Sequence, residues 1–176
     1  ALGDDALGSN TTADKNTAVG KDAMNANTTG YDNVAVGRNS LDANTTGHSN
    51  TSVGESSLTS NTSGIRNVAV GQNALSSNTT GEQNIAIGRN ALDANTTAND
   101  NIAIGDQSLT ACTTGGGNVC IGDNAGASID IGIQNVCIGQ NAGDGLNGSN
   151  GKWNVAIGLG ALSASTATFQ STAVGQ

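Results

Sequence analysis

A pentapeptide of the form Asn-x-small-[Val/Ile]-Gly recurs along this chain at a spacing of 17 residues. It reads NVAVG at 33–37, NIAIG at 84–88 and NVCIG at 118–122. A two-residue insertion between Gly139 and Gly158 is the one break in the spacing of the glycines that end it. A fixed period over a whole chain determines the architecture more strongly than any local signal. The chain is therefore expected to be a repeat array.

The full repeat reads G-x-x-[AS]-L-x-x-N-T-T-G-x-x-N-[VIT]-A-[VI]. Seventeen residues are too few for the paired elements of most helical repeats. β-Branched residues alternate with alanine at a period of two, and Gly, Asn and Thr stand at both ends, which is typical of strands and turns. The sequence predicts an all-β fold, a parallel β-solenoid or β-roll with one 17-residue coil per repeat.

The alternation assigns residues to two faces of each strand. Val34 and Val36 share one face, and Ala35 lies on the other. We expect the valines to point into the coil together with Leu41. The predicted coil core comprises Val36, Leu41, Val70, Leu75, Ile87, Leu92 and Ile104.

The opposite face carries a small residue in every repeat, where a solvent face would vary and carry charge. A ladder kept small over ten coils suggests that another chain approaches it closely, although alanine would also suit a tight corner. Three aliphatic side chains per coil offset little of the cost of ordering its backbone, which favours oligomerisation. The interface candidates are Ala18, Ala35, Ser52, Ala69, Ala86, Ala103, Cys120, Cys137, Ala156 and Ala173.

The repeats divide into a regular part, residues 1–122, and a divergent part, residues 123–176. In the divergent part Gly126 and Gly143 replace the leucine, and a Gly- and Asn-rich loop insertion lies around 143–153. Lys152 and Trp153 form a candidate binding loop for a glycan, because an exposed indole stacks on sugar faces. Alternatively, Trp153 and Phe169 cap the end of the core.

Composition excludes several classes of function. The net charge is −8, and six basic residues stand singly, so no basic stripe exists to neutralise phosphates and no nucleic-acid partner is expected. No apolar run is long enough to span a bilayer, so no membrane insertion is expected. The first residues show no charged-then-apolar leader, so we expect any signal or attachment segment to lie outside this chain.

The sequence offers little for catalysis, and we expect no enzyme activity and no cofactor. A hydrolase or transferase site needs a base, a nucleophile or paired carboxylates brought together. His48 is the one histidine and stands in a variable turn, and the acids are scattered. Asp4 with Asp5, or Asp123 with Asp130, could chelate an ion weakly, but surface solvation explains them better, and no metal site is predicted.

Cys120 and Cys137 replace the small residue in adjacent repeats, close enough for a disulfide. Parallel Cβ vectors favour free thiols that act as small hydrophobes, and Cys112 leaves an odd count. The Asn-Thr-Thr turns create N-glycosylation sequons, but their stacking favours a ladder of hydrogen-bonded amides. These sequons begin at Asn10, Asn27, Asn44, Asn61, Asn78 and Asn95.

The repeated G-x-N-A-L-x-x-N-T-T-G-x-x-N-V-A-V-G pattern resembles the repeat arrays of phage tail-fibre-type proteins, over nearly the whole chain. It is more distantly similar to the head repeats of trimeric autotransporter adhesins, from which it departs in its 17-residue period. The resemblance implies a homotrimeric fibre segment on a virion or cell surface, with Val34, Ala35 and Val36 in the matching motif. Such a segment holds a rigid spacing and can present loops to a cell-surface glycan or receptor.

Three alternatives remain open. The chain could be a bacterial surface adhesin, or a filament of solenoids stacked end to end. It could also be an ice-binding β-solenoid that uses its paired threonines, such as Thr45 and Thr46, although only one of each pair can face outward.

Overall fold

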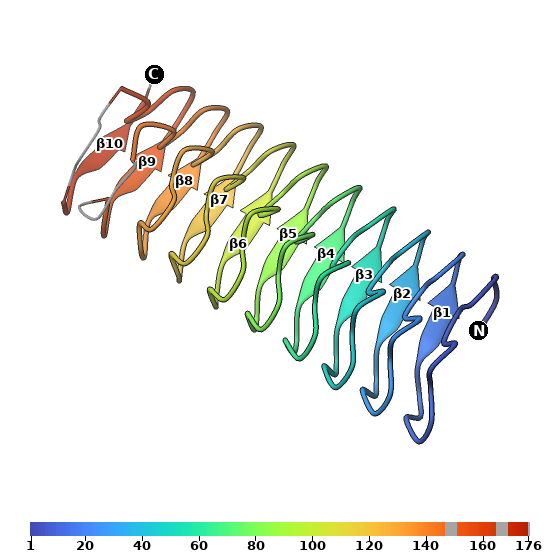
Figure 1. Ribbon diagram of the computed structural model, residues 1–176. Helices are drawn as coiled ribbons and strands as arrows, with labels where there is room; N and C mark the ends of the chain where they lie inside the picture. Colours follow the sequence, from blue (N-terminus) through green and yellow to red (C-terminus); the bar gives the residue numbers. More distant parts are fainter. Residues whose placement is uncertain (147–150, 165–168, 176) are drawn as a thin grey trace.

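The computed structural model describes residues 1–146, 151–164 and 169–175. Its ten strands form one sheet in strict chain order, and every neighbouring pair is parallel (Figure 1). The strands are β1 (Thr17–Val19), β2 (Val34–Val36), β3 (Thr51–Val53), β4 (Val68–Val70), β5 (Ile85–Ile87), β6 (Ile102–Ile104), β7 (Val119–Ile121), β8 (Val136–Ile138), β9 (Val155–Ile157) and β10 (Thr172–Val174).

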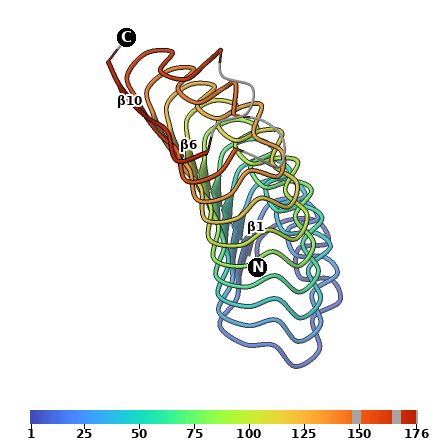
Figure 2. The ribbon, with the colours of Figure 1, turned by 90° about the vertical axis from the view of Figure 1, so that its left-hand side faces the viewer.

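Each strand pairs with the same residues of the next repeat. Ala35 lies opposite Ser52, and Cys120 lies opposite Cys137. One repeat therefore makes one coil, and the coils stack with the strands gathered on one side and the turns on the other (Figure 2). The predicted all-β parallel solenoid with 17-residue coils is confirmed.

The turns require four residues with positive φ in a regular coil. In the coil of β2 these are Gly37 at 136°, Asn39 at 56°, Leu41 at 55° and Ser49 at 60°. The first value suits glycine alone, whereas the other three are left-handed α conformations. Hydrogen bonds between coils hold these turns, as where the Leu41 amide donates to the Ser57 carbonyl at 3.0 Å.

Asparagine ladders run along the inside of the corners. The Asn44 side-chain amide donates to Asn27 Oδ1 of the preceding coil at 2.8 Å and to the Gly47 carbonyl at 3.0 Å. The predicted amide ladder is thus present, and all its sequon asparagines except the exposed Asn10 are buried. A second buried ladder consists of Asn33, Asn50, Asn67, Asn84, Asn101, Asn118, Asn135 and Asn154.

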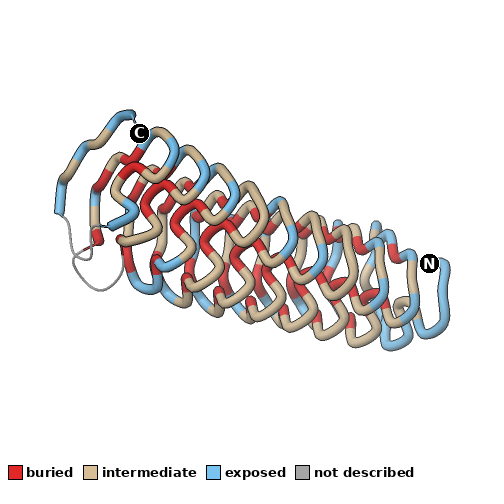
Figure 3. Tube along the Cα trace, turned by 90° about the horizontal axis from the view of Figure 1, so that it is seen from above, coloured by how far each residue is buried: buried red, intermediate tan, exposed pale blue. Residues whose placement is uncertain are grey.

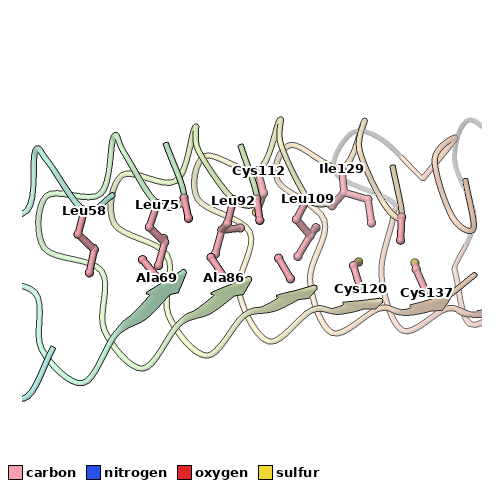
Figure 4. Close-up of a cluster of buried hydrophobic side chains, with 14 of the residues drawn as sticks. Leu58, Ala69, Leu75, Ala86, Leu92, Leu109, Cys112, Cys120, Ile129 and Cys137 are labelled. Atoms are coloured by element: carbon pink, nitrogen blue, oxygen red, sulfur yellow. The ribbon is translucent and has the colours of Figure 1, made fainter. Parts of the chain in front are cut away.

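The core lies between the sheet and the leucine side of each coil. The leucines reach toward the strands, and the small middle residues of the strands point back at them (Figure 4). Burial follows this inner layer along the solenoid (Figure 3). Leu41, Leu75 and Leu92 are fully buried, as are Leu58 and Leu109.

The prediction was wrong for the other residues of the expected coil core, which lie outside it. The alternation of inward and outward side chains has the opposite phase to the one expected. Val36 and Ile87 are exposed on the outside of the sheet, and Val70 and Ile104 are half-buried there. In each of these three-residue strands the middle side chain points inward and the two flanking side chains point outward. The leucine already fills the narrow space between the two sides of the coil, so the facing residue must be small.

The divergent coils keep the core filled, because larger side chains at two positions compensate for the loss of the leucine at a third. Where Cys120 replaces the alanine, Gly126 replaces the leucine and Ile129 replaces the ladder asparagine. A Cβ at Gly126 would lie 2.6 Å from Cys120 Sγ and 2.9 Å from Ile129 Cδ1, so these side chains occupy the volume of the missing leucine. The next coil repeats the exchange with Cys137, Gly143 and Leu146.

Candidate functional site

The outer face of the sheet is the most distinctive surface of this protein. It carries the first and third residues of every strand, two columns that we call the outer stripe. Val19 and Val36 are each 37% exposed, and Ile87 is 38% exposed. The outer stripe comprises Thr17, Val19, Val34, Val36, Thr51, Val53, Val68, Val70, Ile85, Ile87, Ile102, Ile104, Val119, Ile121, Val136, Ile138, Val155, Ile157, Thr172 and Val174.

The dimensions of the outer stripe follow from sheet geometry. Ten strands spaced by about 4.8 Å make it about 43 Å long, and its two columns lie about 7 Å apart. An apolar patch of this extent, on the order of a few hundred Å², matches the largest patch on a typical monomer, and such patches often serve in binding, above all where polar residues rim them. The outer stripe is therefore a candidate protein–protein interface.

Polar side chains border this stripe. The residue after each strand-ending glycine forms a column of mixed charge along one edge. Lys21 lies 3.8 Å from Asp4, Arg38 pairs with Glu55, and Arg89 lies 2.7 Å from Asp106. The hydrogen bond from Arg89 lowers the pKa of Asp106, which keeps that carboxylate ionised.

The small residues predicted to meet another chain lie inside the coil instead. All are buried except Ala173, which is half-buried in the last described coil: Ala18, Ala35, Ser52, Ala69, Ala86, Ala103, Cys120, Cys137 and Ala156. They face the leucine side of their own coil, so no second chain can reach them. The other reading of the sequence, that alanine fits a tight space, accounts for them.

The coil of β3 shows how the interior restricts the residue at the middle of a strand. Ser52 replaces the alanine, and its hydroxyl lies 2.8 Å from Ser40 Oγ and 2.6 Å from Ser57 Oγ. Each buried hydroxyl finds a partner, which offsets its desolvation. In the sequence, serine at position 52 occurs together with Ser40 and Ser57, and Cys120 occurs together with Gly126 in place of the leucine. These joint changes are the signal that could have placed the small residues inside the coil.

Lys152 and Trp153 do not lie on the loop insertion. They occupy the two positions before the buried Asn154, which we call the corner pair of a coil. Backbone bonds stack the corner pairs, as where the Trp153 amide donates to the Ile133 carbonyl at 3.2 Å. Of the insertion expected around 143–153, residues 147–150 lie outside the described part of the chain.

Trp153 and Phe169 lie on the surface of the corner. They are 43% and 56% exposed, and their rings meet edge to face at 4.9 Å. The Trp153 indole donates to Gln134 Oε1 at 2.5 Å. The alternative that these aromatics cap the core is therefore wrong, and the indole ring is partly exposed while its N–H is taken up by Gln134.

The paired threonines have different environments. The first hydroxyl of each pair is used within the fold, as where Thr45 donates to the Thr62 carbonyl at 3.0 Å. The second residue is exposed, as at Thr46, Thr80 and Thr97. Only one threonine of each pair therefore faces outward, in a single column along the solenoid. An ice-binding surface would have this one column of hydroxyls instead of two.

His48 and the three cysteines are the histidine and thiol side chains that the sequence offers as a base or a nucleophile. His48 stacks on Tyr31 with ring centroids 4.6 Å apart. Cys112, Cys120 and Cys137 are free and buried, and burial raises the pKa of Cys112 to about 12. Neutral buried thiols are poor nucleophiles.

Within residues 1–146, 151–164 and 169–175, no three His, Cys, Asp or Glu side chains gather to hold a metal ion. The same residues form no helix that is long and apolar enough to cross a membrane.

The fold defines the chain as a parallel β-solenoid repeat protein. No protein-family model matches it, and no curated protein and no solved structure matches it either.

Proposed function

We propose that this chain is a structural segment of a homotrimeric fibre, of the kind found in phage tail fibres and other surface appendages. The outer stripe carries the proposal, because it is a continuous and largely apolar surface that runs the length of the stacked coils. Three chains that bring these stripes together around one axis remove them from water. The proposed interface thus moves from the alanine column to the valine and isoleucine columns.

The chemistry of the rod supports a mechanical role. Adjacent coils are joined by strand pairing, by turn hydrogen bonds and by two amide ladders, so the shape depends on contacts between neighbouring repeats. The described residues offer neither a reactive cysteine nor a group of metal ligands. A fixed spacer that displays surfaces along its length fits these properties on a virion or cell surface.

The test is the solution mass, measured by light scattering with and without charge in the outer stripe. We expect the native chain to show three times its own mass. The double variant I87D/I104D should dissociate it, because two carboxylates per chain would have to be buried in the interface. The matched control T80D/T97D adds the same charge on the exposed threonine column and should keep the threefold mass.

Two other results for the solution mass would contradict the trimeric fibre. A mass of two chains that I87D/I104D halves would indicate paired rods. A stable monomer would contradict the fibre role and free both the outer stripe and the threonine column. Inhibition of ice recrystallisation by that monomer would then support the ice-binding alternative.

A further inference from the structure

The stack of corner pairs contains one gap. Most corner pairs carry side chains of substantial size, such as Tyr31 with Asp32 and Ile133 with Gln134, whereas Gly116 and Gly117 carry none. An open, solvent-exposed hollow of about 390 Å³ lies at this point. We call it the corner notch, and it is lined by Thr97, Asn99, Asp100, Thr114, Ile133 and Gln134 around the two glycines.

The notch has the thickness of one layer of side chains. Coils continue above and below it in register, because the Gly117 amide donates to the Asn99 carbonyl at 3.1 Å and the Gln134 amide donates to the Gly116 carbonyl at 3.0 Å. Its two walls therefore lie two coils apart, about 9.6 Å between backbones. That separation admits one flat ring in contact with both walls.

The same column shows how a ring is held elsewhere in the solenoid. Tyr31 and His48 occupy the first corner position of neighbouring coils, with their rings 4.6 Å apart and inclined by 7°. The spacing of the coils thus allows two rings to stack face to face when both occupy the first corner position. A ring supplied by a ligand at Gly116 would occupy the layer that these side chains fill in other coils.

The lining selects the chemistry of that ring. Ile133 offers an apolar wall, and the hydroxyls of Thr97 and Thr114 and the carboxylate of Asp100 lie around it. The side-chain oxygens of Asn99 and Gln134 already accept from the Glu82 amide and the Trp153 indole, so these two residues offer their NH₂ groups as donors. A pyranose has C–H faces and hydroxyls at its edge, which matches this distribution. These polar residues are exposed, and the hydroxyls of a pyranose can replace the water bound to them, which an aromatic ring cannot do. Asp100 and the lack of a cation in the lining disfavour an acidic sugar.

We infer that the corner notch binds one pyranose ring of a neutral saccharide. Its biological meaning rests on the proposed surface fibre, since a displayed rod would use such a site to hold a glycan. Binding itself needs one chain only. Trp153 reports on it, because this sole tryptophan donates to Gln134 Oε1 in the wall of the notch.

The experiment titrates the protein with the methyl glycosides of glucose, galactose, mannose and N-acetylglucosamine. Trp153 fluorescence and saturation-transfer NMR are recorded together. We expect at least one glycoside to change the fluorescence saturably and to receive magnetisation through its ring protons. D100N should weaken that binding at least tenfold without changing the circular dichroism spectrum, because an amide accepts fewer hydrogen bonds than a carboxylate.

The decisive variant fills the notch. G116N/G117D introduces the side chains of the preceding corner pair, Asn99 and Asp100, and should abolish binding. A Cβ at Gly116 would lie 3.1 Å from the Asn99 carbonyl oxygen, and one at Gly117 3.2 Å from Gln134 Cγ, so small adjustments accommodate both. The control H48N/S49D makes the same pair in a coil that has no notch, and should leave binding unchanged.

Three results would overturn the inference. These are no saturable response to any of the four glycosides, binding that survives in G116N/G117D, and a response to N-acetyltyrosine amide alone. Mass and binding are measured separately. A monomer that binds a glycoside would therefore contradict the trimeric fibre but support saccharide binding in the corner notch. A trimer that binds no glycoside would support the fibre and contradict binding in the notch.

Discussion

Gly126 offers the sharpest test of how the core of this solenoid is built. In the regular coils its position is occupied by the buried leucine, as at Leu109. Gly126→Leu therefore restores the consensus residue, and a sequence-based argument would predict greater stability. The structure predicts the opposite, because two neighbouring side chains already occupy the volume.

The magnitude follows from two costs. A Cβ at this position would lie 2.6 Å from Cys120 Sγ and 2.9 Å from Ile129 Cδ1, and overpacking of this kind typically costs about 1–3 kcal/mol. The φ of Gly126 is 61°, and a side chain in that left-handed region costs about 1–2 kcal/mol more. We expect the free energy of unfolding to fall by about 2–5 kcal/mol.

The assay measures that free energy by urea unfolding, with hydrogen exchange of the Leu109 amide as a local readout. This amide donates to the Ala125 carbonyl of the altered coil at 3.0 Å. C120A/I129V removes the two atoms that lie within 3.0 Å of the new Cβ. Gly126→Leu should therefore cost much less in that background, with a coupling energy of about 2–3 kcal/mol. Additive effects, or a more stable single variant, would refute this account of the core.

Three further predictions concern the ladders, the thiols and the turns. Asn78→Ala should lower the free energy of unfolding by about 3–5 kcal/mol, because it removes three buried hydrogen bonds, to Asn61 Oδ1, to the Gly81 carbonyl and from the Asn95 amide. Asn10→Ala, at the exposed end of the ladder, should cost under about 1 kcal/mol in the same urea titration. The pKa of Cys112 near 12 means that the folded state keeps a proton which the unfolded state loses above pH 9. Stability should therefore fall as the pH rises from 9 toward 12, and fall less in Cys112→Ala, while iodoacetamide should label the native thiol far more slowly than the unfolded one. Gln83 has a φ of 59°, so Gln83→Val should lower the melting temperature and Gln83→Gly should not; equal melting temperatures would contradict left-handed strain at this corner.

The functional surfaces were only partly predictable from the sequence. The amide ladder could be predicted because each Asn-Thr-Thr turn recurs at the same place in every repeat. The outer stripe was missed, although the same valines and isoleucines were noticed, because they were assigned to the interior. The corner notch was missed because Gly116 and Gly117 look like an ordinary turn until the side chains above and below them are in place.

The sequence by itself determined the period, the strand positions and the parallel stacking. Identical residues at a fixed spacing can satisfy their backbone groups by pairing with their own equivalents, and that requirement is local and repetitive. It could not determine which phase of the alternation points inward, because Val36 and Ala35 are both apolar and both alternate correctly. The tertiary structure decided this through volume: Leu41 crosses the narrow coil from the opposite side and leaves room only for a small residue such as alanine or serine. The valines therefore face outward, where they form the surface on which the proposed assembly depends.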